Sequence, residues 1–490
     1  MVHYDLIVIG SGPAGRRAAI QGAKLKKSVL LVEKGHRVGG VCVHTGTIPS
    51  KTLRETVLNL SGWRERGFYG RSYRVKQNIS AADLSQRLSI TLNHEVEILE
   101  HQFARNKVDS AKGTARFIDP RRIEILGTDD KLAQYTADRF IIAVGTAPYR
   151  PPEIPFDGEA ILDADDILNL KRLPRSLAVI GATVIGIEYA TIFSALDVKV
   201  TVVEPGTSVL PFVDQEVIDE FIHDMRDRGM TLRFRSKVVR VERKGADACL
   251  LHLEDGRQVW SEMVLFAAGR QGAVSALNLH AAGLEADSRG RIAVNKETFQ
   301  TAQPHIYAAG DIIGFPSLAS TSMEQGRIAA CHALGVEAPS PPEFFPYGIY
   351  SVPEISTIGM TEEQAREKNI PYECGIARFR ETSRGHIMGL SSGFLKMIFA
   401  LDTQRLLGVH IVGEGATELI HIGQAVLNLG GTLEYFVDNT FNYPTLAEAY
   451  KIAALDAWNR MPRLQRSARS ALEIADTIAE AAPRAKSGAA

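Results

Sequence analysis

The sequence predicts an α/β protein in which two parallel-sheet domains are followed by a smaller α+β domain. Two observations predict this fold. Near the N-terminus, an apolar strand, a glycine-rich turn, a helix and a second strand ending in glutamate follow one another, and the same order returns after residue 175. Proline-rich segments at 148–152 and 338–342 then divide the chain, whose 490 residues suffice for roughly two to four domains.

The first repeat carries the glycine pattern of a dinucleotide-binding turn. The apolar run 6–9 ends at Gly10, and glycines recur at positions 12 and 15. We expect Gly10 to make the tight turn, Gly12 to let the backbone approach a pyrophosphate, and Gly15 to let the helix pack against the strand. Glu33 ends the next strand, where its carboxylate can accept hydrogen bonds from a ribose. This unit therefore predicts a nucleotide site.

The second repeat departs from this pattern at its middle position. Gly181 and Gly186 are present, but Thr183 replaces the middle glycine, and we expect its side chain to crowd a pyrophosphate. Glu204 would accept a ribose 2′-hydroxyl and repel a 2′-phosphate, which favours NAD over NADP, and no arginine follows it closely along the chain. The unit indicates dinucleotide binding, with a merely structural βαβ unit as the alternative.

The later strands return the chain to its first domain. The apolar segments 264–270 and 306–311 end in glycine, as strands do at the carboxyl edge of a parallel sheet. The predicted division is a first nucleotide-binding domain at 1–150 and 271–340, a second at 151–270, an α+β interface domain at 341–461, and a C-terminal tail at 462–490 with an alanine-rich helical stripe.

Composition excludes several classes of function. The 56 Lys and Arg against 57 Asp and Glu give a net charge of −1, so neither nucleic acid nor an acidic membrane is an expected partner. No apolar stretch has the length of a membrane span, and no signal peptide is apparent. The four cysteines are Cys42, Cys249, Cys331 and Cys374. They lie far apart and lack the spacing of a metal site, which predicts a cytoplasmic protein that holds no metal.

Several segments together resemble a known group of enzymes. Residues 10–15, 39–51, 181–188, 268–270, 308–311 and 442–445 are similar to those of the flavin-containing pyridine nucleotide-disulfide oxidoreductases, and the resemblance extends to about residue 460. Within that superfamily, Gly-Thr-Ile-Pro-Ser-Lys at 46–51 and Asn-Tyr-Pro-Thr-Leu-Ala-Glu-Ala-Tyr at 442–450 most resemble the soluble pyridine nucleotide transhydrogenases. The resemblance implies two Rossmann-like domains, for FAD and for NAD(P), and a homodimer built on the C-terminal domain.

The resemblance also implies which residues hold the dinucleotides. Glu33 would bind the adenosine ribose of FAD, and residues 113–115 and Gly145 match two further turns that line FAD. The complete set implied for FAD is Gly10, Gly12, Gly15, Glu33, Lys34, Gly39, Gly40, Val41, Cys42, Gly113, Thr114, Ala115, Gly145, Gly310 and Asp311. The set implied for NAD(H) or NADP(H) is Gly181, Gly186, Glu204 and Gly269.

Two residue pairs match positions beside the flavin of relatives. Lys51 and Glu188 correspond to a lysine and a glutamate that pair near the flavin N5, where a cation would stabilise negative charge on the reduced ring; an ordinary interdomain salt bridge is the alternative. Relatives that reduce disulfides use a histidine and a glutamate to manage thiol protons. Here Tyr443 stands in place of the histidine and Glu448 remains, and a phenol is a poor proton shuttle near neutral pH.

Thr47 is the most informative departure from the disulfide-reducing relatives, because it stands where they carry a second cysteine. A disulfide relay needs two ionisable sulfur atoms, and Cys42 alone supplies one. The resemblance therefore implies a transhydrogenase of the Si-specific type that passes hydride from NADPH through FAD to NAD⁺ without a protein disulfide. Alternatives are an NAD(P)H diaphorase or quinone reductase with the same flavin, and a non-catalytic flavin-binding redox sensor acting through Cys42.

Overall fold

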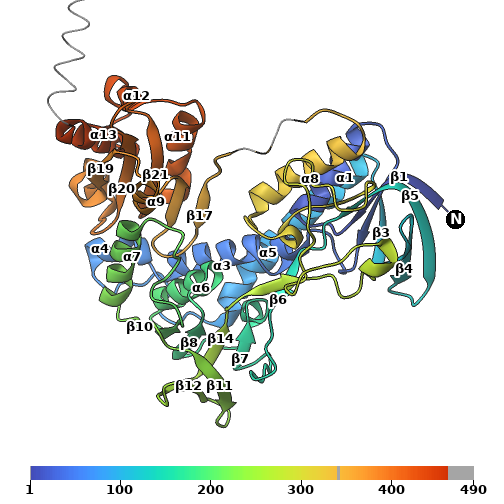
Figure 1. Ribbon diagram of the computed structural model, residues 1–490. Coiled ribbons are helices and arrows are strands. Elements are labelled where there is room, and N and C mark those ends of the chain that lie inside the picture. The colour runs from blue at the N-terminus through green and yellow to red at the C-terminus, as the bar shows by residue number, and fades with distance from the viewer. Residues whose placement is uncertain (1, 339–340, 342, 462–490) are drawn as a thin grey trace, which may run out of the picture.

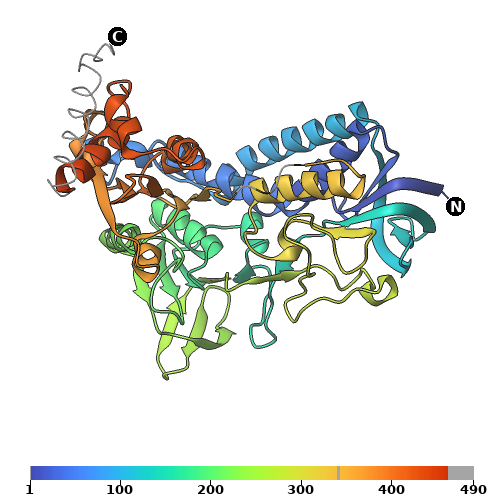
Figure 2. The ribbon, with the colours of Figure 1, turned by 45° about the horizontal axis from the view of Figure 1, so that its top comes forward.

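The computed structural model describes residues 2–338, 341 and 343–461, and its mixed helices and strands confirm the predicted fold class. The predicted tail at 462–490 lies outside the described residues. Three sheets follow one another along the molecule, and the antiparallel C-terminal sheet lies at the opposite end from β1 (Figures 1 and 2).

The first sheet combines parallel strands with an antiparallel meander. Its strands are β1 (Val2–Ile9), β2 (Val29–Glu33), β3 (Asp109–Asp119), β4 (Arg122–Gly127), β5 (Leu132–Ile142) and β16 (Ile306–Ala308). β1 pairs in parallel with both β2 and β5, and β16 pairs with β5. Leu6 and Val8 pack into one apolar cluster and Ile7 and Ile9 into another, because both faces of this parallel sheet are covered.

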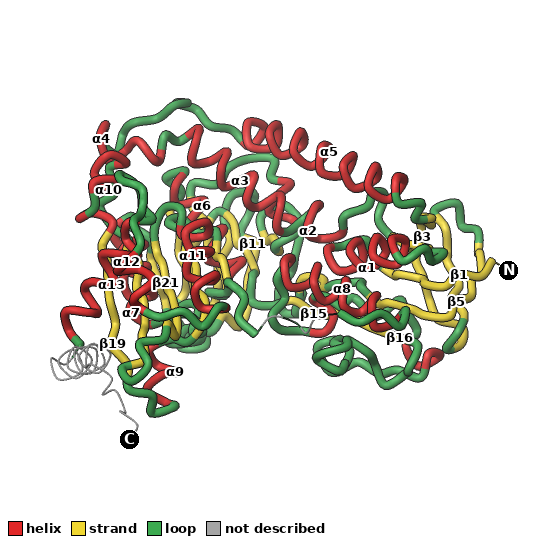
Figure 3. The backbone as a smooth tube through the Cα atoms, turned by 90° about the horizontal axis from the view of Figure 1, so that it is seen from above, coloured by secondary structure: helices red, strands yellow, loops and turns green. Residues whose placement is uncertain are grey.

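Two helices cover one face of this sheet at the glycine turn. α1 (Pro13–Lys24) packs against α8 (Ala319–Ala333), as Figure 1 shows. The approach is so close that a Cβ atom on Gly326 would lie 2.0 Å from the carbonyl oxygen of Ala14. Further along the molecule, α5 (Ala81–Arg105) lies beside α3 (Thr47–Leu60), and α3 reaches the second domain (Figure 3).

The second sheet is fully parallel. Its order is β10 (Thr231–Arg233), β9 (Lys199–Val203), β8 (Ser176–Ile180), β14 (Met263–Phe266) and β7 (Ile161–Asp163), with helices α6 (Val184–Ala195) and α7 (Gln215–Asp227). A meander of β11 (Val238–Arg243), β12 (Cys249–Leu253) and β13 (Gln258–Ser261) shares an apolar cluster with it. The two-stranded ribbon of β6 (Thr146–Pro148) and β15 (Arg270–Gly272) joins this part of the chain to the first sheet region.

The C-terminal domain is an antiparallel sheet covered by helices. Its order is β17 (Tyr347–Ile349), β18 (Ile355–Gly359), β21 (Leu406–Val412), β20 (Phe394–Ala400) and β19 (Tyr372–Arg378). Its helices are α9 (Glu362–Glu367), α10 (Ser383–Met388), α11 (Ala416–Asn428), α12 (Leu433–Asp438) and α13 (Glu448–Arg460). The remaining short elements are α2 (Gly40–His44), α4 (Arg66–Tyr69), η1 (Trp63–Glu65), η2 (Asp166–Asn169), η3 (Leu279–Ala282), η4 (Asp311–Ile313) and η5 (Phe379–Glu381).

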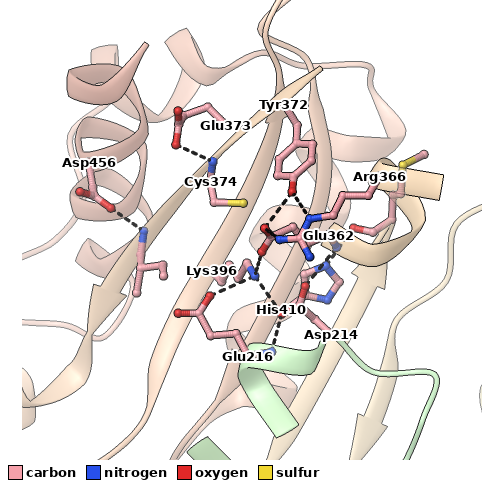
Figure 4. A network of polar contacts seen from close by, with 12 residues as sticks. Asp214, Glu216, Glu362, Arg366, Tyr372, Glu373, Cys374, Lys396, His410 and Asp456 are labelled. Atoms are coloured by element: carbon pink, nitrogen blue, oxygen red, sulfur yellow. Dashed lines mark hydrogen bonds and ion pairs between the residues drawn. The ribbon is translucent and has the colours of Figure 1, made fainter. Parts of the chain in front are cut away.

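A buried ionic network fastens the second domain to the C-terminal sheet (Figure 4). Lys396 on β20 is 1 % exposed, and its Nζ lies 3.0 Å from Asp214 Oδ1 and 2.5 Å from Glu362 Oε2. Asp214 caps the N-terminus of α7 by accepting from the Glu216 amide, and it also accepts from the Glu362 amide at 3.1 Å. Because one carboxylate serves groups of both domains, their relative position is fixed at this point.

Candidate functional site

The first glycine turn keeps an open space beside one of its three glycines. Gly10 has φ of +104°, and a Cβ on Gly15 would lie 1.8 Å from the Gly10 carbonyl oxygen, so both glycines are required by the turn and the helix themselves. A Cβ on Gly12 would meet nothing within 4 Å, and Gly12 lines a cavity. The helix α1 begins at that space with free amide groups, which fits a pyrophosphate.

Glu33 ties the glycine turn to the next loop. Its Oε2 accepts from the Ser11 amide at 3.0 Å, and its Oε1 accepts from the Gly35 amide at 2.7 Å. The Ser11 hydroxyl donates to the same Oε2 and accepts from the Gly39 amide at 2.8 Å. The carboxylate is thereby fixed at the carboxyl end of β2, at the wall of the cavity.

The cavity at this turn has a volume of about 540 Å³ and brings together most of the residues implied for FAD. Those that line it are Gly10, Gly12, Glu33, Lys34, Gly40, Val41, Cys42, Gly113, Thr114, Ala115, Gly145, Gly310 and Asp311. Gly15 and Gly39 lie behind its surface, where they allow close packing. Residues 113–115 were expected to form a turn. They are instead part of the strand β3, which pairs there with β4.

A second cavity of about 700 Å³ adjoins the first, and it is lined from all three sheet regions. Lys51 on α3, Glu188 on α6 and Tyr350 after β17 line it, together with Gly269. Thr47 and Asp311 line both cavities and so mark their junction. Burial raises the pKa of the Asp311 carboxyl at this junction.

Lys51 and Glu188 form an ion pair in the second cavity. Lys51 Nζ lies 2.9 Å from Glu188 Oε1 and 2.8 Å from Oε2, and the glutamate side chain is only 5 % exposed. Glu188 Oε1 also accepts from the Tyr350 amide at 2.9 Å, and Lys51 Nζ lies 4.8 Å from the centre of the Tyr350 ring. The three domains therefore meet at one carboxylate, which holds the ammonium group at the cavity wall.

Cys42 faces Thr47 and lacks a second thiol there. Burial raises the pKa of the Cys42 thiol above its ordinary value, and the neighbouring Thr47 hydroxyl and Arg16 charge offset this only in part. All four cysteines of the sequence lie among the described residues, and all are free thiols. A thiol whose pKa is raised is a weak nucleophile near neutral pH, which favours packing over reactivity for Cys42.

The second glycine turn repeats the design of the first. Gly181 has φ of +99°, and a Cβ on Gly186 would lie 2.1 Å from the Gly181 carbonyl oxygen. Glu204 accepts from the amides of Ala182 and Gly206, each at 2.7 Å. The Thr183 hydroxyl donates to the Ala267 carbonyl at 2.7 Å and accepts from the Gly186 amide, so the threonine caps α6 with its hydroxyl turned into the protein.

Tyr443 and Glu448 line neither cavity, nor do Gly181, Gly186 and Glu204 of the second glycine turn. Tyr443 is 73 % exposed, with its hydroxyl 2.6 Å from that of Ser383, and Glu448 is the first residue of α13. Lining residues that the sequence did not single out include Tyr189, Thr146 and His421 in the second cavity. The Tyr189 hydroxyl is buried without a hydrogen-bond partner among the described residues, which suits a ligand amide. No glycine or charge pattern marks these positions in the sequence.

Neither a metal centre nor a membrane span is found in the part of the chain that the structure describes. Within it, no group of three or more histidine, cysteine, aspartate or glutamate side chains could hold a metal ion. No helix described there is long and apolar enough to cross a membrane.

Two dinucleotide turns of one design above adjoining cavities define a class, the flavoprotein oxidoreductases with two nucleotide-binding domains. The family model of the pyridine nucleotide-disulphide oxidoreductases matches residues 4–326, and that of their dimerisation domain matches residues 345–454. The chain belongs to this family, in the branch of the soluble pyridine nucleotide transhydrogenases. The members of this family bind FAD, so FAD is the cofactor of this protein.

The similar proteins cover almost the whole chain. A soluble pyridine nucleotide transhydrogenase of Mycobacterium tuberculosis is 52% identical over 95% of this chain and 99% of its own length. The soluble pyridine nucleotide transhydrogenase of Colwellia psychrerythraea is 42% identical over 94% of this chain and 98% of its own length. Among solved structures, LpdA from Mycobacterium tuberculosis gives a TM-score of 0.85 at 26% identity, covering 93% of this chain and 99% of its own. The flavoprotein disulfide reductase RclA from Escherichia coli gives 0.83 at 27% identity, covering 92% and 99%.

Proposed function

We propose that the protein transfers hydride between NADPH and NAD⁺ by way of FAD, giving NADP⁺ and NADH, with no protein disulfide as relay. The observation that carries this proposal is Thr47, which meets Cys42 at the junction of the two cavities where a disulfide relay would need a second thiol. The curated relatives, named soluble pyridine nucleotide transhydrogenases, support the same reaction.

The first cavity is proposed to hold FAD. The amides at the start of α1 would bind its pyrophosphate across Gly12, and Glu33 would accept hydrogen bonds from the adenosine ribose. Asp311, at the junction, would bind the chain that leads towards the flavin ring. When bound, FAD supplies the chemistry, since it takes hydride from one nicotinamide and gives it to another.

The residues of the second cavity are proposed to position the nicotinamides and to stabilise charge. The ammonium of Lys51 would stabilise negative charge that develops beside it, and Glu188 fixes the ammonium through both carboxylate oxygens. Gly181, Gly186 and Glu204 would hold the adenosine half of the dinucleotide on the second domain. No side chain has to act as a nucleophile, because positioning and electrostatics suffice for hydride transfer.

We further propose a homodimer that works in the cytoplasm. Residues 345–454 match a dimerisation domain, and the exposed Tyr443 lies in the segment that would reach the partner's flavin with Glu448. Four free thiols suit a reducing compartment.

The test is the reduction of thio-NAD⁺ by NADPH with purified, FAD-loaded protein, run beside a quinone acceptor. Rapid formation of thio-NADH that does not depend on quinone supports the transhydrogenase. Quinone reduction without thio-NADH would assign a diaphorase instead. If neither NADH nor NADPH bleaches the flavin in stopped-flow mixing, the protein is not an enzyme of either kind, and the non-catalytic redox sensor is the remaining hypothesis. Protein stripped of FAD is the control and should form no thio-NADH.

A further inference from the structure

The proposed function sets a demand on the adenosine end of the second domain. One site must accept NAD(H), which has a 2′-hydroxyl, and NADP(H), which has a 2′-phosphate. A carboxylate at the end of the second strand suits the hydroxyl alone, because it accepts a hydrogen bond from it and repels a phosphate. Glu204 occupies that position, so a group of opposite charge is needed nearby.

The pairing of β10 with β9, and the residues that follow β10, bring the backbones of Arg233 and Arg235 beside Glu204 and Gly206. β10 runs parallel to β9, with Arg233 opposite Val203. The Glu204 amide donates to the Arg233 carbonyl at 2.9 Å, and the Arg235 amide donates to the Gly206 carbonyl at 2.9 Å. Neither arginine closely follows Glu204 along the chain, which is why the residues next to Glu204 in the sequence do not reveal them.

The polar groups at this rim lack partners within the protein. The Nε atom of Arg233 and the hydroxyl of Ser208 are buried and have no hydrogen-bond partner among the described residues. Arg235 is exposed, and its side chain forms no ion pair or hydrogen bond with any residue that the structure describes. Buried polar groups are ordinarily paired, so a guanidinium nitrogen and a hydroxyl left open beside one loop indicate a polar ligand.

The loop beside these groups is open to solvent. Residues 205–207, between Glu204 and Ser208, are exposed at the carboxyl edge of the sheet, which is where dinucleotides bind in this type of fold. Both oxygens of Glu204 already accept from backbone amides, at Ala182 and Gly206, so its charge is partly compensated.

We propose that Arg233, Arg235 and Ser208 form the subsite for the 2′-phosphate of NADP(H), beside the Glu204 carboxylate that serves the 2′-hydroxyl of NAD(H). Guanidinium groups bind phosphate oxygens through paired, charge-assisted hydrogen bonds, and the serine hydroxyl adds a neutral donor. The acid and the arginines together give one site two ways to hold the ribose. This subsite rests on the proposed function, which requires both dinucleotides to use the same domain.

The test compares two fragments that differ only in the 2′-phosphate. Binding of 2′,5′-ADP and 5′-AMP is measured by calorimetry on the FAD-loaded protein and on the variants R233M, R235M and the double variant. We expect each single change to weaken 2′,5′-ADP about tenfold to a hundredfold, the loss typical of a hydrogen bond to a charged group, and to leave 5′-AMP within about twofold. KM should rise for NADPH and stay the same for NADH.

A matched control and a folding check accompany these variants. Lys237 is an exposed cation on the same segment, 3.1 Å from Glu254, and K237M should bind both fragments like the original protein. Each variant must keep the flavin absorbance spectrum and the melting temperature of the original. Unchanged 2′,5′-ADP binding in the double variant overturns the subsite, and so does an equal loss for 5′-AMP.

The two proposals can fail separately. If NADPH does not reduce thio-NAD⁺ but 2′,5′-ADP binding still depends on the arginines, the proposed function is wrong and the subsite stands. If the reaction proceeds and 2′,5′-ADP binding ignores the arginines, the function stands and the subsite is wrong.

Discussion

Replacing Lys396 by methionine should destabilise the protein strongly, because it removes the cation at the centre of the network in Figure 4. The ammonium is 1 % exposed and contacts three carboxylates, of which Asp214 is fully buried. Without it, Asp214 loses its cationic partner in a buried position, whereas Glu362 still pairs with Arg366. Removing one partner of a buried ion pair typically costs about 3–5 kcal/mol. At roughly 2–4 °C per kcal/mol for a domain of this size, the melting temperature should fall by about 6–20 °C.

The pH dependence of this loss gives a sharper test than its size. Burial alone would raise the pKa of Asp214, but the charges of His410 and Lys396 hold it below its ordinary value, so the original protein keeps this stability above about pH 4 and loses it only at lower pH. Burial opposes the charge of Lys396 as well, yet Asp214 and Glu362 keep its pKa raised, so its contribution is constant below about pH 10. Replacing Lys396 removes a charge that lowers the pKa values of Asp214, Glu362 and His410. The folded variant therefore takes up protons at higher pH than the original protein does, and its deficit in stability should shrink, not grow, as the pH falls from 7 to 5.

Thermal unfolding of both proteins at pH 5, 6 and 7 measures the two slopes. K171M is the control, because Lys171 forms an exposed pair with Glu159 that contributes little to stability. K396R, which keeps the charge, should recover part of the loss. The reasoning is refuted if K396M melts within about 1 °C of the original protein at pH 7, or if its deficit grows towards pH 5.

Three further predictions concern the cavities. G12A should fold and melt like the original apoprotein yet retain little FAD, because the added methyl group fills the open space beside Gly12. G15A should have a lower melting temperature, because its Cβ would collide with the Gly10 carbonyl. A flavin content in G12A equal to that of the original protein would contradict this reasoning. K51M should shift the flavin midpoint potential to more negative values and slow bleaching by NADPH about tenfold or more, and an unchanged potential would reduce the Lys51–Glu188 pair to a structural salt bridge. T47C should add a second thiol beside Cys42, so that anaerobic titration takes up two more electrons per flavin than in the original protein; an identical uptake would show that no disulfide forms.

The sequence predicted the parts of the site that depend on local backbone geometry. Gly10 and Gly181 adopt positive φ in the predicted turns, and Glu33 and Glu204 end the predicted strands. Such features are readable because glycine is needed wherever a side chain would collide with the neighbouring strand or helix.

Positions that depend on distant pairing were not readable. The backbone of Arg233 lies beside Glu204 only because β10 pairs with β9. Tyr189 lies on α6, a helix that is buried almost throughout, so nothing in the sequence distinguishes it from its buried neighbours. The Lys51–Glu188 contact came from family resemblance and not from spacing, since the two residues lie on different domains. Thr183 was expected to crowd a phosphate, but a hydroxyl can turn inward to cap a helix, and residue type alone does not reveal that rotamer.

The two glutamates that close the glycine turns have a consequence for the thermodynamics of binding. Glu33 holds the amides of Ser11 and Gly35, and Glu204 holds those of Ala182 and Gly206, through hydrogen bonds within the protein itself. Because the protein's own carboxylates fix the loops, a ligand loses little free energy to fixing them on binding. For a protein that must release one nicotinamide dinucleotide and accept another in every cycle, such rigidity allows fast exchange, because neither arrival nor departure has to wait for a loop to fold or unfold.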